Sequence, residues 1–294
     1  MDYFLILITV TICFIYDVLK KVYVKNLKNG FNYYSFVFGT SIISVFVFLF
    51  FGIKNISAFT VGLGCLFGVI TLISVISFLK AVKIGLLSYT CVISSLSTII
   101  PTISGSIFWG EKIGFLQITG VFLMLISLVL SVVKSENNKK SFKIWYFYCI
   151  ILFVSTGLIG VLQKVFQDCN YSGQSNEFLL IAFLTNGFIS GIIAICTQKK
   201  SDVIKESDSI KQSNGKILLY IGIIFICGIC CAFNNKINLY LSGRIKSAIL
   251  FPLLNGGGAT LTTIASLVIF KEKLMLRQKI GIFVGIIAII LLCV

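Results

Sequence analysis

The sequence predicts an all-α integral membrane protein in which ten transmembrane helices form two inverted five-helix repeats. Three observations support this expectation: the composition, the spacing of the apolar runs, and motifs that recur in the second half of the chain. The 294 residues are 57% hydrophobic and 12% charged. A soluble domain is roughly a quarter charged, so this composition excludes an ordinary soluble protein.

Ten apolar runs follow one another along the chain, each close to the roughly 20 residues that a bilayer span requires. They cover about residues 3–23, 31–51, 58–79, 86–108, 113–133, 144–166, 176–197, 217–240, 247–270 and 278–294. The first run has no basic region before it and no obvious small-residue cleavage site, which predicts a retained helix rather than a signal peptide. The polar linkers 134–143 and 198–216 are each too short to form a domain. We therefore expect a first repeat at 1–133, a linker at 134–143 and a second repeat at 144–294.

Recurring motifs indicate which runs correspond to each other. A Glu-Lys pair followed by Gln and Gly recurs at an offset of 161 residues. The two sets are Glu111, Lys112, Gln117, Gly120 and Glu272, Lys273, Gln278, Gly281. The segment Val18–Tyr23 matches Val161–Phe166 at an offset of 143. Because five crossings place consecutive repeats in opposite orientations, we expect an inverted repeat.

The basic residues indicate the orientation and account for most of the net charge of +15. Of the 25 lysine and arginine residues, 19 fall at odd-numbered loops, and cytoplasmic loops carry such an excess. We therefore expect a multi-pass protein of the plasma membrane, with odd-numbered loops in the cytoplasm and both termini outside. Since the charge follows the topology, it does not indicate a nucleic-acid partner. The expected partners are the lipid bilayer and a small-molecule substrate.

The residue types present exclude several kinds of chemistry. The chain has no histidine, which removes imidazole as a metal ligand or catalytic base. Most of the ten cysteines lie in apolar runs, where they behave as small hydrophobic residues. No glycine-rich phosphate loop followed by Lys-Ser or Lys-Thr occurs. We therefore expect no disulfide, no metal, no cofactor and no catalytic residue.

Polar residues inside two equivalent runs, the fourth and the ninth, are candidates for substrate binding. Lipid cannot satisfy such groups, so they tend to face the bundle interior. The candidates are Ser94, Ser95 and Thr98 in the fourth run, and Asn255, Gly256 and Gly257 in the ninth. Three consecutive glycines after Pro252 weaken a helix and would present backbone groups to a ligand. The alternative is that these glycines only allow close helix packing.

The eighth run carries two further candidates for substrate binding, Asn235 and Asn238. At i and i+3 they share one helical face, and either line a cavity or form a hydrogen bond between helices. Lys236 is a candidate for coupling or gating. If it faces the cavity, it favours substrates with a carboxylate or phosphate; the alternative is that it extends to the membrane surface.

Acidic residues near the ends of runs are the remaining candidates. Asp17 is a candidate for proton coupling, and the alternative is a local ion pair with Lys20 or Lys21. Glu111 and Glu272 are each followed by a lysine, and we expect them to have a structural role at tight turns between helices.

The five-plus-five plan and the paired Glu-Lys, Gln and Gly motifs resemble the drug/metabolite transporter superfamily, EamA type, over essentially the whole chain. The resemblance implies a ten-helix transporter whose central cavity is lined by the first four helices of each half. It also implies that the fifth and tenth helices are peripheral and available for contacts in a homodimer.

The leading functional hypothesis is a secondary transporter, with export of small metabolites such as amino acids as the expected direction. Alternating access would occur at a site formed by the third, fourth, eighth and ninth helices. An integral membrane enzyme acting on lipid-linked substrates is one alternative, although its clustered acids, histidines or metal motif are missing from the sequence. A non-transporting accessory membrane protein is the other alternative, and it predicts no accessible polar cavity.

Overall fold

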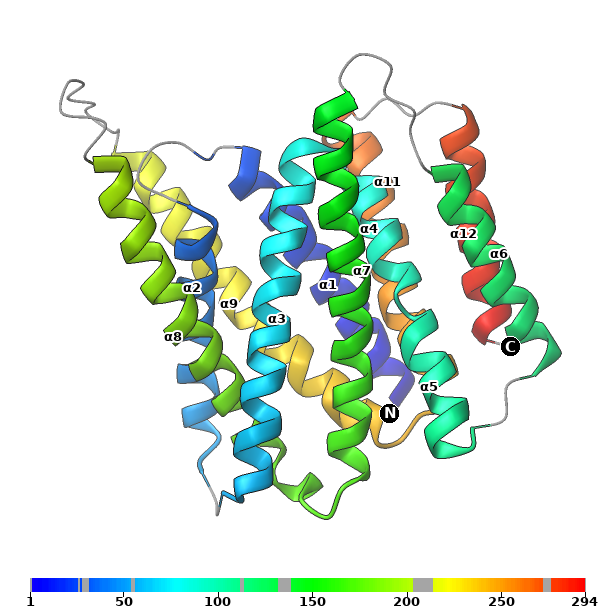
Figure 1. Cartoon of the computed structure of the whole chain (residues 1–294), viewed down its shortest axis with the longest axis horizontal. Coiled ribbons are helices and arrows are strands. Elements are labelled where there is room, and N and C mark those ends of the chain that lie inside the picture. Colours follow the sequence, from blue (N-terminus) through cyan, green and yellow to red (C-terminus); the bar gives the residue numbers. More distant parts are fainter. Residues whose placement is uncertain are drawn as a thin grey trace.

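A computed structural model describes residues 2–25, 27, 32–53, 56–111, 114–131, 139–202, 214–271 and 276–293 (Figure 1). Over these residues the chain is helical and contains no strand. The elements are α1 (Asp2–Lys25), α2 (Tyr33–Phe50), α3 (Ala58–Ile84), α4 (Leu87–Leu96), α5 (Ile99–Trp109), α6 (Phe115–Ser131), α7 (Lys139–Asp168), η1 (Ser172–Gln174), α8 (Ser175–Asp202), α9 (Asn214–Ser242), α10 (Ser247–Phe251), η2 (Pro252–Gly256), α11 (Gly257–Val268) and α12 (Leu276–Cys293).

Eight helical segments in the described part of the chain are long and apolar enough to cross a membrane. Two of them are interrupted: α4 and α5 together form the segment Leu87–Trp109, and α10, η2 and α11 form Ser247–Val268. The expectation of an all-α membrane protein is therefore confirmed. The expected fifth and tenth spans correspond to α6, of 17 residues, and α12, of 18 residues.

Polar residues and glycine mark several ends of these helices. Asn32 caps α2, because its side-chain oxygen accepts a hydrogen bond from the Ser35 backbone N–H at 2.7 Å. Ser57 caps α3 in the same way, accepting from the Thr60 N–H at 3.1 Å. At its C-terminal end, α5 stops at Gly110, which has a left-handed φ of 63° that glycine adopts without strain.

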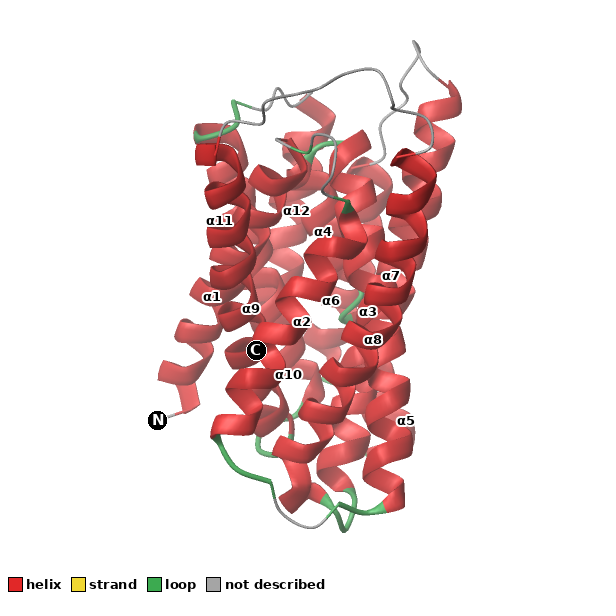
Figure 2. Ribbon diagram, turned by 90° about the vertical axis from the view of Figure 1, so that its left-hand side faces the viewer, coloured by secondary structure: helices red, strands yellow, loops and turns green. Residues whose placement is uncertain are grey.

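Successive spans run in opposite directions through the bundle (Figures 1 and 2). In Figure 1, α1 begins and α12 ends at their lower ends. The end of α1, the end of α3 and the end of α11 lie at the upper end, whereas α5 ends and α10 begins at the lower end. The helix ends therefore gather at two ends of the bundle, which are called upper and lower below, as they stand in Figure 1.

The helices of the two halves are interleaved. α2 packs along α8, α3 packs on both α7 and α8, and α9 packs on both α1 and α2. α4 packs on α11, while α6 packs along α12 at one edge of the bundle (Figure 1). Both halves therefore contribute to the centre of the molecule.

Aromatic stacking and small residues hold the α3–α7–α8 region together. The rings of Phe166 and Phe178 stack with centroids 4.2 Å apart, and both side chains are fully buried. Gly68 of α3 faces the carbonyl oxygen of Ala182 on α8 so closely that a Cβ there would clash. Such small residues let helix backbones approach in a membrane, where dispersion contacts replace the hydrophobic effect.

The fourth span bends midway, between α4 and α5. The backbone N–H groups of Ser97 and Thr98 bond to carbonyls three residues back, at 3.3 and 3.2 Å. These bonds wind the chain more tightly than an α-helix.

The ninth span is loosened midway rather than broken. Residues Pro252–Gly256 form a π-helix, and the Gly257 N–H still bonds to Leu253 and Leu254. A Cβ on Gly257 would lie 3.1 Å from Val10 of α1. This segment thus combines looser winding at Gly256 with close packing at Gly257.

Candidate binding cavity

A cavity with a volume of about 180 Å³, to which many polar side chains contribute, lies between the two halves and is called the central cavity below. Its lining residues come from α1, α2, α3 and α4 in the first half and from α7, α8, α9 and η2 in the second. No described residue of α6 or α12 is among them. Since a water molecule occupies about 30 Å³ of liquid volume, this space suits a small polar molecule.

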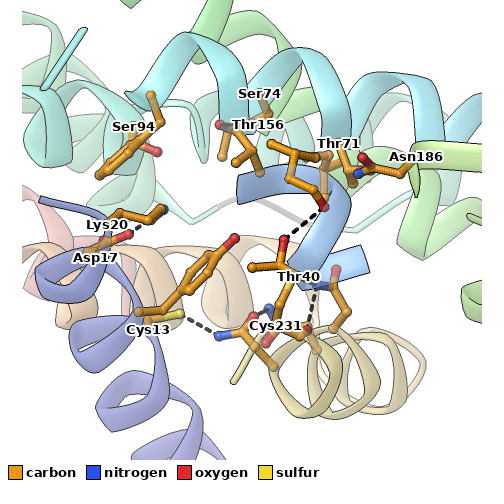
Figure 3. Close-up of a pocket in the computed structure, with 18 of the residues that line it drawn as sticks. Cys13, Asp17, Lys20, Thr40, Thr71, Ser74, Ser94, Thr156, Asn186 and Cys231 are labelled. Atoms are coloured by element: carbon orange, nitrogen blue, oxygen red, sulfur yellow. Dashed lines mark hydrogen bonds and ion pairs between the residues drawn. The ribbon is translucent and has the colours of Figure 1, made fainter. Parts of the chain in front are cut away.

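One wall of the central cavity carries an ion pair within α1. The Lys20 ammonium lies 2.7 Å from Asp17 Oδ1, and the two side chains are 7% and 20% exposed. Lys20 Nζ also lies 3.6 Å from the ring centroid of Phe78 and 4.2 Å from that of Tyr16. Cys91 Sγ donates to Asp17 Oδ2 at 3.8 Å. The charges are therefore balanced locally, and both face the cavity (Figure 3).

A second wall is formed by asparagines on α9. Asn234 Nδ2 donates to Cys13 Sγ at 2.7 Å, and Asn238 Nδ2 donates to Asn234 Oδ1 at 2.8 Å. Asn235 Nδ2 donates to the Cys231 carbonyl at 2.9 Å. This chain of bonds fixes the orientation of the amides, so they are preorganised for a ligand.

Across the central cavity from the ion pair, polar residues of α3, α7 and α8 complete the lining. Asn186 Nδ2 donates to Thr71 Oγ1 at 3.2 Å, and Figure 3 places both residues on the side away from Asp17. The hydroxyls of Ser74 and Thr156 lie 3.1 Å apart. The cavity is therefore polar on several sides in an otherwise apolar bundle.

Three buried amide atoms in this lining have no hydrogen-bond partner among the described residues. They are Gln163 Nε2, Asn186 Oδ1 and Asn238 Oδ1. Gln163 and Asn186 are only 2% and 3% exposed. Buried polar groups are nearly always bonded, so one donor and two acceptors are left unsatisfied beside the central cavity.

The structure brings together five of the ten residues that the sequence marks as candidates for binding or coupling. These are Asp17, Ser94, Asn235, Asn238 and Asn255, all of which line the central cavity. They come from four different helical elements, α1, α4, α9 and η2.

The other candidates lie outside the central cavity. Ser95 donates to the Val92 carbonyl at 2.8 Å and lines a separate small space between α4, α11 and α12. Thr98 is fully buried and Gly256 is buried within η2, while Gly257 packs on α1. Lys236 lies over the Phe51 ring, with Nζ 2.9 Å from its centroid.

Several lining residues were not identified from the sequence. They are polar residues of α1, α2, α3, α7 and α8 together with one more asparagine of α9: Cys13, Tyr16, Thr40, Ser41, Thr71, Ser74, Thr156, Gln163, Asn186 and Asn234. The repeat alignment would have found some of them. The offset of 143 relates Lys20 to Gln163, and the offset of 161 relates Asn235 to Ser74.

Glu111 connects α5 with two other helices at the lower end of the bundle. Its carboxylate lies 3.0 Å from Lys164 Nζ and accepts a hydrogen bond from the Ser247 backbone N–H at 2.9 Å. Nearby, Trp109 Nε1 donates to Asp168 at 2.9 Å. These contacts tie the end of α5 to α7 and α10, whereas the role expected of Glu111 was local, at a tight turn between helices. Glu272, its expected counterpart, lies outside the described residues.

Comparison with known proteins gives information on the fold alone. No protein-family model and no curated protein matches the chain. Among 27 similar chains of solved structures, one titled "Crystal structure of protein" superposes with a TM-score of 0.63 at 11% sequence identity, covering 96% of this chain and 97% of that one. The chain thus has the fold of a known structure over nearly its whole length.

Proposed function

We propose that the protein is a secondary transporter that exports small polar metabolites, such as amino acids, across the plasma membrane. The observation that carries this proposal is the central cavity, which residues of both halves line and beside which buried polar atoms lack partners among the described residues. A buried polar cavity in a bundle of apolar helices costs stability unless a ligand or water occupies it. A role in binding explains why these residues are present.

Ten spans in two inverted repeats form the framework of this proposal. If α1, α2 and α3 correspond to α7, α8 and α9, the packing of α3 on α7 and α8 becomes the packing of α9 on α1 and α2. Both sets of contacts occur. Pairs of residues at the repeat offsets also line the central cavity together, namely Cys13 with Thr156, Lys20 with Gln163, Ser74 with Asn235 and Ser94 with Asn255. These matching helix contacts and residue pairs support two equivalent halves and hence alternating access.

The distribution of charge supports an orientation with the upper end in the cytoplasm. Lys25, Lys83 and Lys271 lie at the ends of α1, α3 and α11, which are upper ends in Figure 1. Cytoplasmic surfaces carry the excess of basic residues, so both termini would be outside. Opening of the lower end would then require the contacts of Glu111 to separate.

The lining favours neutral or zwitterionic substrates. Asp17 and Lys20 are the two charged residues among the described lining residues, and they neutralise each other. A molecule carrying both an ammonium and a carboxylate, or amide-like donors and acceptors, would match this pair and the three unpartnered amide atoms. This charge balance agrees with the small metabolites that the resemblance to EamA-type transporters implies.

A thermal-shift screen of the purified protein against a metabolite panel tests the proposal. A ligand that binds only the folded state at a hundredfold excess over its Kd stabilises by about 2.7 kcal/mol. Ser94→Ala and Asn235→Ala should abolish the shift, whereas Ser95→Ala, one residue outside the cavity, should retain it. Transport of the hit into proteoliposomes then completes the test. A shift that survives in both cavity variants would place the site elsewhere, and no saturable transport would reject the function.

A further inference from the structure

The Lys20 ammonium group fills a box that one carboxylate and two aromatic rings form at the wall of the central cavity. It lies 2.7 Å from Asp17 Oδ1, 3.6 Å from the centroid of the Phe78 ring and 4.2 Å from that of Tyr16. All of these residues line the central cavity, and Lys20 and Asp17 lie side by side in Figure 3. Asp17, Tyr16 and Phe78 are called the ammonium box below.

The ammonium box has the chemistry that proteins use to recognise ammonium ligands. A cation within about 6 Å of an aromatic centroid is attracted by the face of the ring, and several rings together form the cages that bind choline and methylated lysine. A carboxylate adds a charge-assisted hydrogen bond. The Phe78 side chain is 3% exposed and belongs to a buried cluster with Val82 and Leu152, so its ring is held in place by packing.

Lys20 is held in the ammonium box by a flexible tether. It lies three residues after Asp17 on the same helix, α1, and a flexible four-carbon stem joins its ammonium to the backbone. The ammonium can therefore leave the box without a movement of α1. Its described contacts are the Asp17 carboxylate and the two rings. An ammonium group of a ligand can make the same contacts.

Stability alone does not account for this buried ion pair. The side chains of Lys20 and Asp17 are 7% and 20% exposed, and removing such charges from water costs free energy that their attraction often fails to recover. Well-packed apolar side chains of similar volume are often as stable. A pair that lines a cavity gains a binding role, because each charge can take a partner from a ligand.

We propose that the ammonium group of a zwitterionic substrate displaces Lys20 from the ammonium box, and that the released Lys20 binds the carboxylate of the same substrate. This inference rests on the transporter proposed above and assigns the residues that hold each end of its substrate. Two ion pairs then replace one, and every charge in the exchange remains paired. A simple amine would leave Lys20 unpaired beside a second positive charge, and a simple acid would have to compete with Asp17 for Lys20. The pair therefore favours zwitterions.

Ligand analogues test the exchange in the native protein. Thermal unfolding in detergent is measured with each of the common amino acids. For the amino acid that stabilises most, it is repeated with the carboxylic acid that lacks the ammonium group and with the amine that lacks the carboxylate. Each analogue loses one contact between charged groups, so it should bind at least about tenfold more weakly than the amino acid.

Lys20→Ala empties the ammonium box and should reverse this preference. Propylammonium carries the atoms that the substitution removes, so it should raise the melting temperature of Lys20→Ala above that in sodium chloride at equal ionic strength. It should not stabilise the native protein, whose box is filled. Lys20→Ala should also bind the amine analogue more tightly than the amino acid, because the carboxylate has lost its partner. A purely structural ion pair would allow the rescue by propylammonium but no change in ligand preference.

Two further variants make the test specific. Lys20→Gln keeps a hydrogen-bond donor for Asp17, so it serves if Lys20→Ala does not fold, and it should show the same reversed preference. Lys21→Gln removes the adjacent charge of α1. Because Lys21 Nζ donates to the Val82 carbonyl at 3.0 Å and Lys21 does not line the central cavity, this variant should keep the native preference.

Tighter binding of the amino acid than of both analogues, with a reversed preference in the Lys20 variants and not in Lys21→Gln, would support the inference. An ammonium-free analogue that binds as tightly as the amino acid would overturn it, as would a preference that the Lys20 variants leave unchanged. Absence of stabilisation by every amino acid would overturn it as well. The proposed function fails on a different result, the absence of saturable transport in proteoliposomes.

Discussion

Glu111 and Ser247 lie 136 residues apart in the chain, and the Glu111 carboxylate accepts a hydrogen bond from the Ser247 backbone N–H at 2.9 Å. The same carboxylate is 3.0 Å from Lys164 Nζ, with the two side chains only 10% and 15% exposed. One side chain therefore joins the end of α5 to α7 and to the start of α10. The contact links the first half of the chain to the second.

Replacing Glu111 by Gln should destabilise the protein by about 3 kcal/mol, because Lys164 would remain buried without its counter-charge. Thermal unfolding in detergent measures the effect. Adding Lys164→Gln to this variant should recover part of the loss, since the orphaned charge is removed. An unchanged melting temperature in Glu111→Gln would mean that the lower end is not held by this ion pair.

Two glycines on α3 should respond in opposite directions to substitution by alanine. A Cβ on Gly68 would clash with the Ala182 carbonyl oxygen of α8, whereas a Cβ on Gly62 would meet nothing within 4 Å. We expect Gly68→Ala to destabilise by about 1–3 kcal/mol through overpacking. Gly62→Ala should be neutral or stabilise by up to about 1 kcal/mol through helix propensity. Equal effects of the two changes on thermal unfolding would contradict the close α3–α8 contact.

The contact between α6 and α12 is testable with a double-mutant cycle. Ser127 Oγ donates to the Gly281 carbonyl at 2.7 Å, and a Cβ on Gly285 would lie 2.7 Å from the same hydroxyl oxygen. Gly285→Ala should therefore displace Ser127 and destabilise, and Ser127→Ala should cost about 0.6 kcal/mol. In the double variant the clash is absent, so its stability should equal that of Ser127→Ala alone. Additive losses would show that α6 and α12 do not meet at this point.

The sequence predicts the helices and marks the two interrupted spans because both depend on local properties. Apolar runs of spanning length fold as helices in a bilayer, and the serine-rich and glycine-rich segments at matching offsets change the winding of α4–α5 and η2. Ser94 and Asn255 both line the central cavity, because each interruption places one polar side chain at the centre.

Positions that depend on which neighbour a helix face meets could not be predicted. Ser95 is adjacent to Ser94 in sequence, but its face packs toward α11, and the helical pattern does not specify that neighbour. Asn186 is an isolated amide in an apolar run, a pattern equally typical of a hydrogen bond between helices. Its role depends on Thr71, which lies 115 residues earlier in the chain.

Asp17 can be tested separately for pairing and for proton coupling. In Asp17→Asn, Lys20 loses its partner inside the bundle, so we expect reduced stability and slower but measurable transport. The exchange of Asp17→Lys with Lys20→Asp retains one pair in the same wall and should restore much of the stability. If the carboxylate at position 17 carries a proton, transport by the exchanged variant should lose its pH dependence. A pH dependence that is unchanged in a functional Asp17→Asn variant would reject the coupling role.

Gln163 tests whether an unsatisfied polar group beside the central cavity lowers the stability of the free protein and contributes to ligand binding. Its Nε2 is buried without a partner among the described residues, and such a group costs about 1–3 kcal/mol. Gln163→Met has similar volume and no amide, so the ligand-free protein should be more stable by about 1 kcal/mol while the ligand-induced thermal shift disappears. Gln167, one turn further along α7, bonds through Nε2 to Ser175 at 3.2 Å, so Gln167→Met should lose stability and keep the shift. If the two variants behaved alike, the unpartnered amide would not be part of a binding site.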